Sequence, residues 1–253
     1  MENPMNHKLG MTSVTFREKT IEEVAALAAK AGLSEIEWGG DRHVLPGDTD
    51  AVRRANEAMA KYGLVCPSYG SYYRFGDNDA AAFETICATA KDLGASTVRT
   101  WLGRRGSAVM PTEMRESILA EVRMLSDIAA KYGQTLAFEF HGKTLNDTGA
   151  SSIAFLSECG KENVKTYWQP LSFSENEKNL SMVLPYLVSV HVFTWDDEYQ
   201  RYPLEDGAEK WRGYLDILKK AGVSTHLIME FVKDDSEERF LADAAFLHTL
   251  CEE

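Results

Sequence analysis

Four polar residues stand near the ends of successive apolar runs in the second half of the chain: Glu139, Gln169, His191 and Glu230. In the run Leu-Ala-Phe-Glu-Phe-His (136–141), the alternation of a strand would place Glu139 and His141 opposite the apolar side chains. Gln169, His191 and Glu230 have the same relation to their own runs. Two carboxylates, an imidazole and an amide oxygen form a ligand set for one divalent cation. The oxygens favour Mn²⁺ or Mg²⁺, and Zn²⁺ or Co²⁺ are also compatible.

Each of the four residues also has a purely structural explanation. A glutamate at the mouth of a barrel often forms an ion pair with arginine, and an isolated histidine is more often hydrogen-bonded structure than a ligand. Gln169 is the weakest member, because a neutral amide is a poor ligand beside carboxylates. The joint position of the four residues on consecutive strands favours a metal site over four separate structural roles.

Other residues fall where they would contact a substrate. Glu37 ends a predicted strand and His43 follows in the next loop, so either would hydrogen-bond hydroxyl groups or support the loop. Arg99 and Trp101 share one face of a later strand. The arginine suits a bidentate phosphate or carboxylate contact, or is simply solvated, and the indole suits stacking on the C–H face of a sugar.

Two further candidates lie beside the predicted ligands. His141 would orient Glu139 or a substrate hydroxyl group. Lys233, three residues past Glu230, would reach a substrate oxygen or pair with a neighbouring aspartate. Aromatic residues in the loop after the third predicted strand would stack on substrate or cap the core: Tyr69, Tyr72 and Tyr73.

Glycines recur where helices should end. Each follows a helix-like segment and precedes a short apolar run, as a left-handed C-cap does: Gly32, Gly63, Gly94, Gly133, Gly160 and Gly222. One further helix is expected to end at Leu184-Pro185. The first helix should begin at a capping box, Thr20 to Glu23.

This spacing predicts eight strand–helix units. Strands are expected near 8–14, 34–38, 64–68, 96–101, 135–141, 164–169, 187–193 and 225–231. Helices are expected near 20–31, 48–62, 78–93, 113–132, 149–159, 176–184, 207–221 and 236–251. Eight alternating units without a Gly-x-Gly-x-x-Gly turn favour an α/β fold with a single (β/α)8 TIM barrel over residues 1–253.

The composition excludes several classes of protein. The formal net charge of −12 opposes binding to nucleic-acid phosphates, which rewards lysine and arginine. No apolar run approaches the roughly 20 residues that span a bilayer, and the start of the chain is polar. We therefore expect a cytoplasmic protein. The cysteines at 66, 87, 159 and 251 form no Cys-x-x-Cys pair, so we expect free, mostly buried thiols.

Several of these stretches resemble a known family over nearly the whole chain. They are similar to the sugar phosphate isomerase/epimerase superfamily of xylose isomerase-like barrels: Ile36-Glu37-Trp38-Gly39-Gly40, Phe138-Glu139-Phe140-His141, Val190-His191-Val192-Phe193 and Met229-Glu230-Phe231. The resemblance implies one metal ion held at the ends of strands five to eight, where Glu139, His191 and Glu230 match. Gln169 stands where an aspartate is usual. The lost charge would weaken metal binding and leave the ion a stronger Lewis acid, or would mark a degraded site.

The resemblance also implies a reaction. A sugar or sugar phosphate isomerase or epimerase would move a proton beside a carbonyl group through an enediolate, with Glu139 and Glu230 as the acid–base pair. A metal-dependent dehydratase of a keto-cyclitol or related keto-acid shares the first step. A non-catalytic sugar-binding barrel is the alternative outside the enzymes. Cleavage of DNA like that of endonuclease IV is opposed by the charge of −12. Similar proteins commonly form homo-oligomers.

Overall fold

Eight parallel strands close into a barrel in the computed structural model, which describes residues 6–253. Around the closed ring the strands are β1 (Lys8–Thr12), β10 (His226–Met229), β7 (Leu187–Val192), β6 (Val164–Trp168), β5 (Thr135–Phe138), β4 (Thr97–Leu102), β3 (Ser68–Phe75) and β2 (Glu35–Gly39). The predicted (β/α)8 architecture is confirmed.

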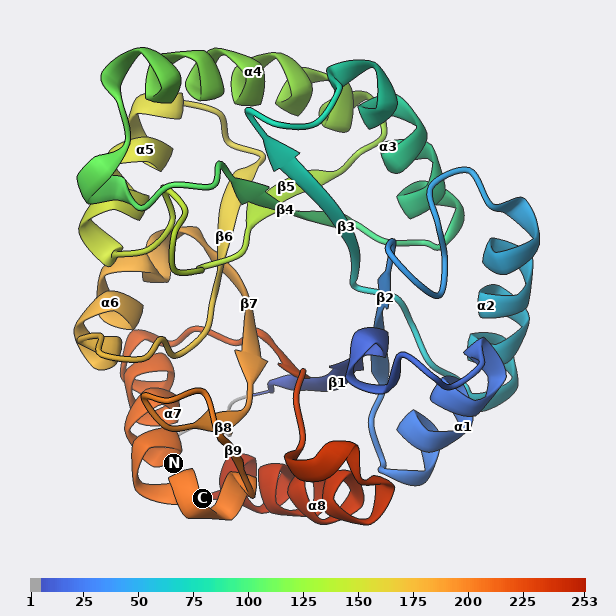
Figure 1. Cartoon of the computed structure of the whole chain (residues 1–253). Coiled ribbons are helices and arrows are strands. Elements are labelled where there is room, and N and C mark those ends of the chain that lie inside the picture. The colour runs from blue at the N-terminus through green and yellow to red at the C-terminus, as the bar shows by residue number, and fades with distance from the viewer. Residues whose placement is uncertain (1–5) are drawn as a thin grey trace.

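Eight helices surround this barrel (Figure 1). They are α1 (Ile21–Lys30), α2 (Thr49–Tyr62), α3 (Phe83–Asp92), α4 (Thr112–Lys131), α5 (Gly149–Cys159), α6 (Asn176–Val183), α7 (Ala208–Ala221) and α8 (Glu237–Glu252). The last helix, α8, lies between α7 and α1, so the ring of helices closes where β10 pairs with β1 (Figure 1). Among the described residues, no helix is both long and apolar enough to cross a membrane.

Local sequence signals determine where the helices begin and end. At the start of α1, the amide of Glu23 donates to Thr20 Oγ1 at 3.3 Å, and the amide of Thr20 donates to Glu23 Oε2 at 2.7 Å, so the capping box is confirmed. The glycines predicted to end helices all adopt positive φ, as the left-handed cap requires: Gly32, Gly63, Gly94, Gly133, Gly160 and Gly222. The helix α6 ends at Val183, and a 3-10 turn containing Pro185 follows it.

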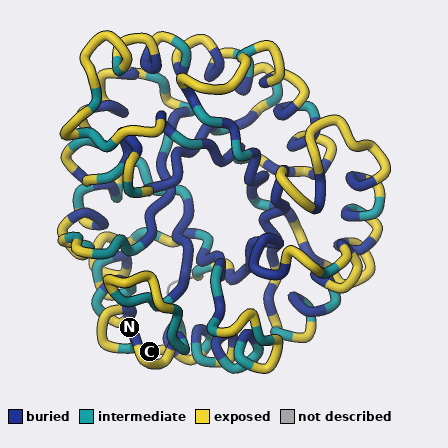
Figure 2. The backbone as a smooth tube through the Cα atoms, viewed as in Figure 1, coloured by how far each residue is buried: buried dark blue, intermediate teal, exposed yellow. Residues whose placement is uncertain are grey.

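The apolar core lies between the outer face of the barrel and the helices. Buried backbone forms the inner ring in Figure 2, and the exposed segments lie at the periphery. Leu136, Phe138 and Phe140 are fully buried in this layer, as their alternation predicts. Cys66, Cys87 and Cys159 are buried, Cys251 is half-buried and all four are free thiols, which confirms that expectation.

The third strand differs from its predicted range. The prediction of 64–68 is wrong, because β3 runs from Ser68 to Phe75 and Val65 makes only an isolated bridge to Glu35. The pairing of β3 with β4 shifts between Gly70 and Arg74, as at a β-bulge. The tyrosines that were expected in a loop, Tyr69, Tyr72 and Tyr73, therefore belong to the strand. A hairpin of β8 (Thr194–Trp195) and β9 (Arg201–Tyr202) was not predicted.

The inside of this barrel is unusually polar. TIM barrel interiors are dominated by branched apolar side chains, whereas here Glu37, Arg99, Tyr167 and His191 are fully buried. A Cβ atom at Gly70 would lie 2.6 Å from Arg99 Nη2, so this glycine leaves the room that the guanidinium occupies. Because buried charges are stable only when paired, the fold depends on the partners of these residues.

Candidate metal centre

Three of the predicted ligands converge at one end of the barrel. His191 lies in β7, while Glu139 and Glu230 directly follow β5 and β10. One ligand atom from each of the three residues lies within 4.8 Å of the others, and all three side chains are buried. Gln169 directly follows β6 and joins this group. The alternation in four separate strands therefore places these side chains together at the carboxyl ends of the strands, where TIM barrels carry their active sites.

His191 is held between two carboxylates. Its Nδ1 lies 3.4 Å from Glu230 Oε2 and 3.0 Å from Gln169 Oε1, while its Nε2 lies 3.6 Å from Glu37 Oε1. Burial by itself lowers the pKa of His191, but the carboxylates of Glu230 and Glu37 outweigh burial and raise the pKa to about 10. The imidazole is therefore surrounded by negative charge, and a bound cation would take the place of its extra proton.

Glu139 is fixed by donors on both oxygens. Oε2 accepts from Arg99 Nη1 and from Trp101 Nε1, and Oε1 accepts from Gln169 Nε2 at 3.2 Å. Burial by itself raises the pKa of Glu139, but the positive charges of Arg99 and His191 outweigh burial and lower the pKa. Glu139 is consequently a charged carboxylate with a fixed orientation.

Glu37 and Arg99 support the centre from inside the barrel. Arg99 Nε donates to Glu37 Oε1 at 2.9 Å, and Glu37 Oε2 accepts from Ser68 Oγ at 2.7 Å and from the Tyr167 hydroxyl at 2.9 Å. Both Glu37 oxygens are therefore used, and Arg99 is neutralised by two carboxylates. Glu37 and Arg99 thus hold His191 and Glu139 in place, and a substrate contact by either residue stays a prediction.

The role of Tyr167 was missed by the sequence analysis. Tyr167 donates to Glu37 and packs edge-on against the ring of His191, with 5.1 Å between the ring centroids. Its position two residues before Gln169 places it on the same face of β6, and that alternation was the available signal.

The remaining predicted residues occupy different environments. His43 is buried against Trp38, and its Nε2 lies 3.0 Å from the carbonyl oxygen of Lys19, so it supports the loop; a substrate contact by His43 stays a prediction. Trp101 is half-buried beside Glu139, and the exposed His141 lies 5.6 Å from the Trp101 ring.

Lys233 opens the 3-10 turn that follows β10 and is half-buried. Of the two neighbouring aspartates expected as partners, Asp234 and Asp235, the second bonds instead to Arg201 at 2.5 Å. A substrate contact by Lys233 stays a prediction.

The chemistry of the centre fits a divalent cation. Glu230 Oε2 is buried and has no hydrogen-bond partner among residues 6–253. A buried polar atom without a partner costs about 1–3 kcal/mol, so this oxygen marks a place where a cation or a polar ligand belongs. Carboxylate and imidazole donors within 4.8 Å of one another match the needs of one small divalent ion.

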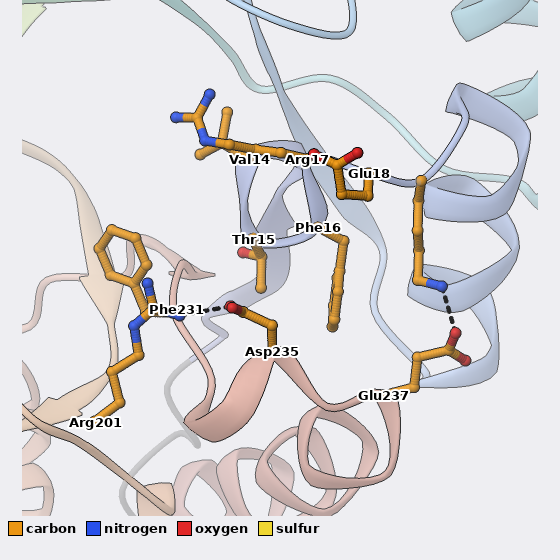
Figure 3. A pocket seen from close by; sticks show the side chains of 10 residues that line it. Val14, Thr15, Phe16, Arg17, Glu18, Arg201, Phe231, Asp235 and Glu237 are labelled. Atoms are coloured by element: carbon orange, nitrogen blue, oxygen red, sulfur yellow. Dashed lines mark hydrogen bonds and ion pairs between the residues drawn. The ribbon is translucent and has the colours of Figure 1, made fainter.

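A cavity of about 500 Å³ lies beside the barrel mouth, next to the turn Ser13–Phe16 (Figure 3). Its lining includes Thr15, whose hydroxyl donates to the carbonyl oxygen of Glu230. The basic residues of the lining face acidic ones, as Figure 3 shows for Arg201 and Asp235. The cavity therefore reaches the backbone of Glu230 through Thr15, and the positive charge of Arg201 in its lining is compensated by Asp235.

Removing the buried guanidinium should destabilise the protein strongly. Arg99→Met leaves the carboxylates of Glu37 and Glu139 buried without their cation, and loss of one member of a buried ion pair costs about 3–5 kcal/mol. Urea unfolding measures this loss in the free energy of unfolding. Arg104→Gln is the control, because Arg104 pairs with Asp77 while 69% exposed, and such pairs contribute under about 1 kcal/mol. Equal, small losses in both variants would contradict a stabilising buried network.

The same ion pairs should make stability depend on acid pH. Burial alone raises the pKa of Glu37, but Arg99 outweighs it and holds the pKa well below the usual range; the pKa of Glu139 is also lowered. The contribution of these two carboxylates to the free energy of unfolding is complete above the unfolded pKa of about 4.3. It is lost as the pH falls towards their folded pKa values. Unfolding free energies measured from neutral to acid pH should fall more steeply for the wild type than for Arg99→Met. Parallel curves would contradict this assignment.

Comparison with known proteins identifies the family. A family model, xylose isomerase-like TIM barrel, matches residues 25–250. The chain belongs to this family. A 3-dehydroshikimate dehydratase of Bacillus anthracis is 28% identical over 167 residues, which is 62% of this chain and 60% of that protein. The match therefore spans less than two thirds of this relative.

Solved structures share the barrel. The protein described as the probable 3-DHS dehydratase AsbF of Bacillus anthracis has a TM-score of 0.82 at 16% identity, covering 95% of this chain and 98% of that one. The apo 3-keto-D-glucoside 4-epimerase YcjR of E. coli has a TM-score of 0.79 at 17% identity, covering 96% and 100%. These likenesses establish the fold, and the two enzymes compared differ in the reaction they catalyse.

Proposed function

We propose that this member of the xylose isomerase-like family is a divalent-metal-dependent isomerase or epimerase of a sugar or sugar phosphate. The observation that carries the proposal is the pair of buried carboxylates, Glu139 and Glu230, each with an oxygen within 4.8 Å of a ring nitrogen of His191. Both oxygens of Glu139 accept hydrogen bonds, whereas Glu230 Oε2 makes none among residues 6–253. The likeness to a keto-sugar epimerase supports the same reading.

The four residues at the strand ends would hold the metal: Glu139, Gln169, His191 and Glu230. A divalent cation there would supply positive charge beside the carbonyl oxygen of the substrate, where negative charge develops as the proton leaves. Glu230 is the better base, because its Oε2 makes no hydrogen bond among residues 6–253 and faces His191 Nδ1 at 3.4 Å, whereas both oxygens of Glu139 accept hydrogen bonds. Glu139, a weaker base because its donors stabilise the charged form, faces the same space and returns the proton. Return to the opposite face gives epimerisation, and return to the neighbouring carbon gives isomerisation.

Three residues border this space and are proposed to contact the substrate. Trp101 would stack against its C–H face, since the indole is held in place by Glu139. His141 would bind a hydroxyl group, and Lys233 a further oxygen. Both lie next to strand ends that carry the proposed acid–base pair.

A dehydratase is the second candidate. It is favoured by the 28% identity to a 3-dehydroshikimate dehydratase and by the TM-score of 0.82 with the same class of enzyme. Removal of the proton by Glu230 would be the shared first step. The electron pair of the broken C–H bond would then form a double bond as a β-hydroxyl group leaves, takes up the proton held by Glu230 and is released as water.

Exchange of substrate protons in D₂O separates these candidates. The Mn²⁺-loaded protein is incubated with ketoses, ketose phosphates and keto-cyclitols, and the products are followed by NMR. Exchange of a C–H proton without enone formation is expected and supports an isomerase or epimerase, whereas an enone identifies a dehydratase. Absence of both with every compound would contradict an enzyme and favour a sugar-binding barrel with a degraded metal site.

The proposal includes the setting expected from the sequence. We expect a small-molecule substrate, no nucleic-acid partner, a cytoplasmic location and a homo-oligomer like those of similar proteins. Light scattering of the purified protein tests the oligomeric state, and a particle of 28.3 kDa would contradict it.

A further inference from the structure

Arg74 is a half-buried arginine at the barrel mouth that the sequence analysis missed. It lies in β3 opposite Trp101 of β4 in the strand pairing. Its guanidinium carbon lies 3.9 Å from the centroid of the Trp101 ring, and its Nη1 donates to the carbonyl oxygen of Gly103 at 2.7 Å. Stacking and one hydrogen bond therefore fix the position of the charge.

Arg74 lacks the acidic partner that other arginines near the mouth have. Arg17 pairs with Asp41, Arg104 with Asp77 and Arg201 with Asp235, while Arg99 pairs with two glutamates. Within residues 6–253, no carboxylate oxygen lies within 4.0 Å of an Arg74 nitrogen. Burial lowers the pKa of Arg74, but a guanidinium remains charged at neutral pH.

The Arg74 guanidinium, which has no salt bridge among residues 6–253, lies one side chain away from the metal centre. Trp101, which Arg74 covers, donates its indole N–H to Glu139. Tyr72 packs edge-on against the same indole, with 5.4 Å between the ring centroids, and has a φ of 59°, a backbone conformation rare for residues other than glycine. Strained residues concentrate at binding and catalytic sites, and here the strain accompanies the bulge that aligns Arg74 with Trp101.

We propose that the substrate carries an anionic group, a carboxylate or a phosphate, and that Arg74 binds it while the carbonyl end lies at Glu139 and Glu230. This inference rests on the proposed function. A guanidinium has five N–H donors, of which Gly103 receives one, so a planar pair of donors remains for two oxygens of one anion. The aromatic platform of Trp101 restricts the direction from which the anion approaches.

Paired neutral and anionic compounds test the inference. The phosphate arm compares D-fructose with D-fructose 6-phosphate, and the carboxylate arm compares a neutral keto-cyclitol with 3-dehydroshikimate. In Arg74→Gln, the KM of the accepted anionic compound should rise about tenfold to a hundredfold, as loss of a charge-assisted bond implies, while kcat changes little. Arg74→Lys keeps the charge but loses the planar fork, and should lie between wild type and Arg74→Gln.

Arg53→Gln is the matched control, because it removes the same charge from an exposed site of α2, where Arg53 pairs with Asp50 and Glu57, and should leave each KM unchanged. If Arg74 only supported the Gly103 carbonyl, Arg74→Gln would change the KM of neutral and anionic compounds alike. Equal KM changes for both members of a pair would therefore overturn the inference.

A binding measurement distinguishes this inference from the proposed function. Calorimetry of Mn²⁺-loaded Glu230→Gln protein measures binding of the same compounds without proton abstraction by Glu230. The expected result is tighter binding of one anionic member than of its neutral counterpart, with that preference lost when Arg74→Gln is added. Such a preference without turnover by the wild type would contradict the proposed isomerase function and still support the anion site. Equal affinities within both pairs, or no binding of either anionic compound, would refute the anion site.

Discussion

Glu230→Gln is expected to lose turnover by roughly 10²–10⁴-fold, the usual contribution of a positioned acid or base. Glutamine has nearly the shape of glutamate but no oxygen that can hold a proton at neutral pH. The fold should survive, because His191 keeps Glu37 as a carboxylate partner and the Thr15 hydroxyl contacts the backbone of Glu230. The rate of C–H exchange in D₂O measures the loss.

Two comparisons make the Glu230 result interpretable. Glu238→Gln removes a carboxylate from an exposed position of α8 and should keep the wild-type rate. Glu139→Gln should lose turnover by a similar factor and also lower the free energy of unfolding, because Arg99 loses one of its two carboxylates. Substantial residual exchange in Glu230→Gln would contradict its assignment as the base.

Gln169→Asp is expected to raise the affinity for Mn²⁺ about tenfold or more, since it adds a charged oxygen to the ligand set. The same change should destabilise the metal-free protein. Gln169 now donates its amide to Glu139 Oε1 at 3.2 Å, and an aspartate would instead place two carboxylates side by side. The two effects therefore have opposite signs: the melting temperature falls without metal and rises more steeply as Mn²⁺ is added.

Gln169→Asn is the control for the shorter side chain, because asparagine has the length of aspartate without its charge. It should not gain affinity. Calorimetric titration with Mn²⁺ and thermal melts of all three proteins provide the readouts. Unchanged affinity in Gln169→Asp would exclude Gln169 from the ligands of the metal.

The predictable part of the site followed from alternation within strands. A strand has a period of two, so Glu139 had to face away from Phe138 and Phe140 whatever the exact ends of β5. The closed barrel then brings the ends of β5, β6, β7 and β10 to the same mouth. The ends of helices could also be predicted from neighbouring residues, because a left-handed C-cap strongly prefers glycine.

The partners across strands could not be predicted in the same way. Alternation places Glu37, Arg99 and Glu139 inside the barrel, but the stagger between strands decides that Arg99 reaches both carboxylates. The pairing of β3 with β4 shifts at a bulge between Gly70 and Arg74, and no periodic pattern in the sequence predicts this shift. For this reason Arg74 was missed.

Metal stoichiometry tests the central claim most directly: Glu139, His191 and Glu230, with Gln169, bind one catalytic ion. The purified wild-type protein and His191→Ala are titrated with Mn²⁺ under identical conditions. The account predicts one tightly bound ion per wild-type chain and loss of that binding in His191→Ala. Weak, equal uptake by both proteins would contradict the metal centre and the reaction proposed for it.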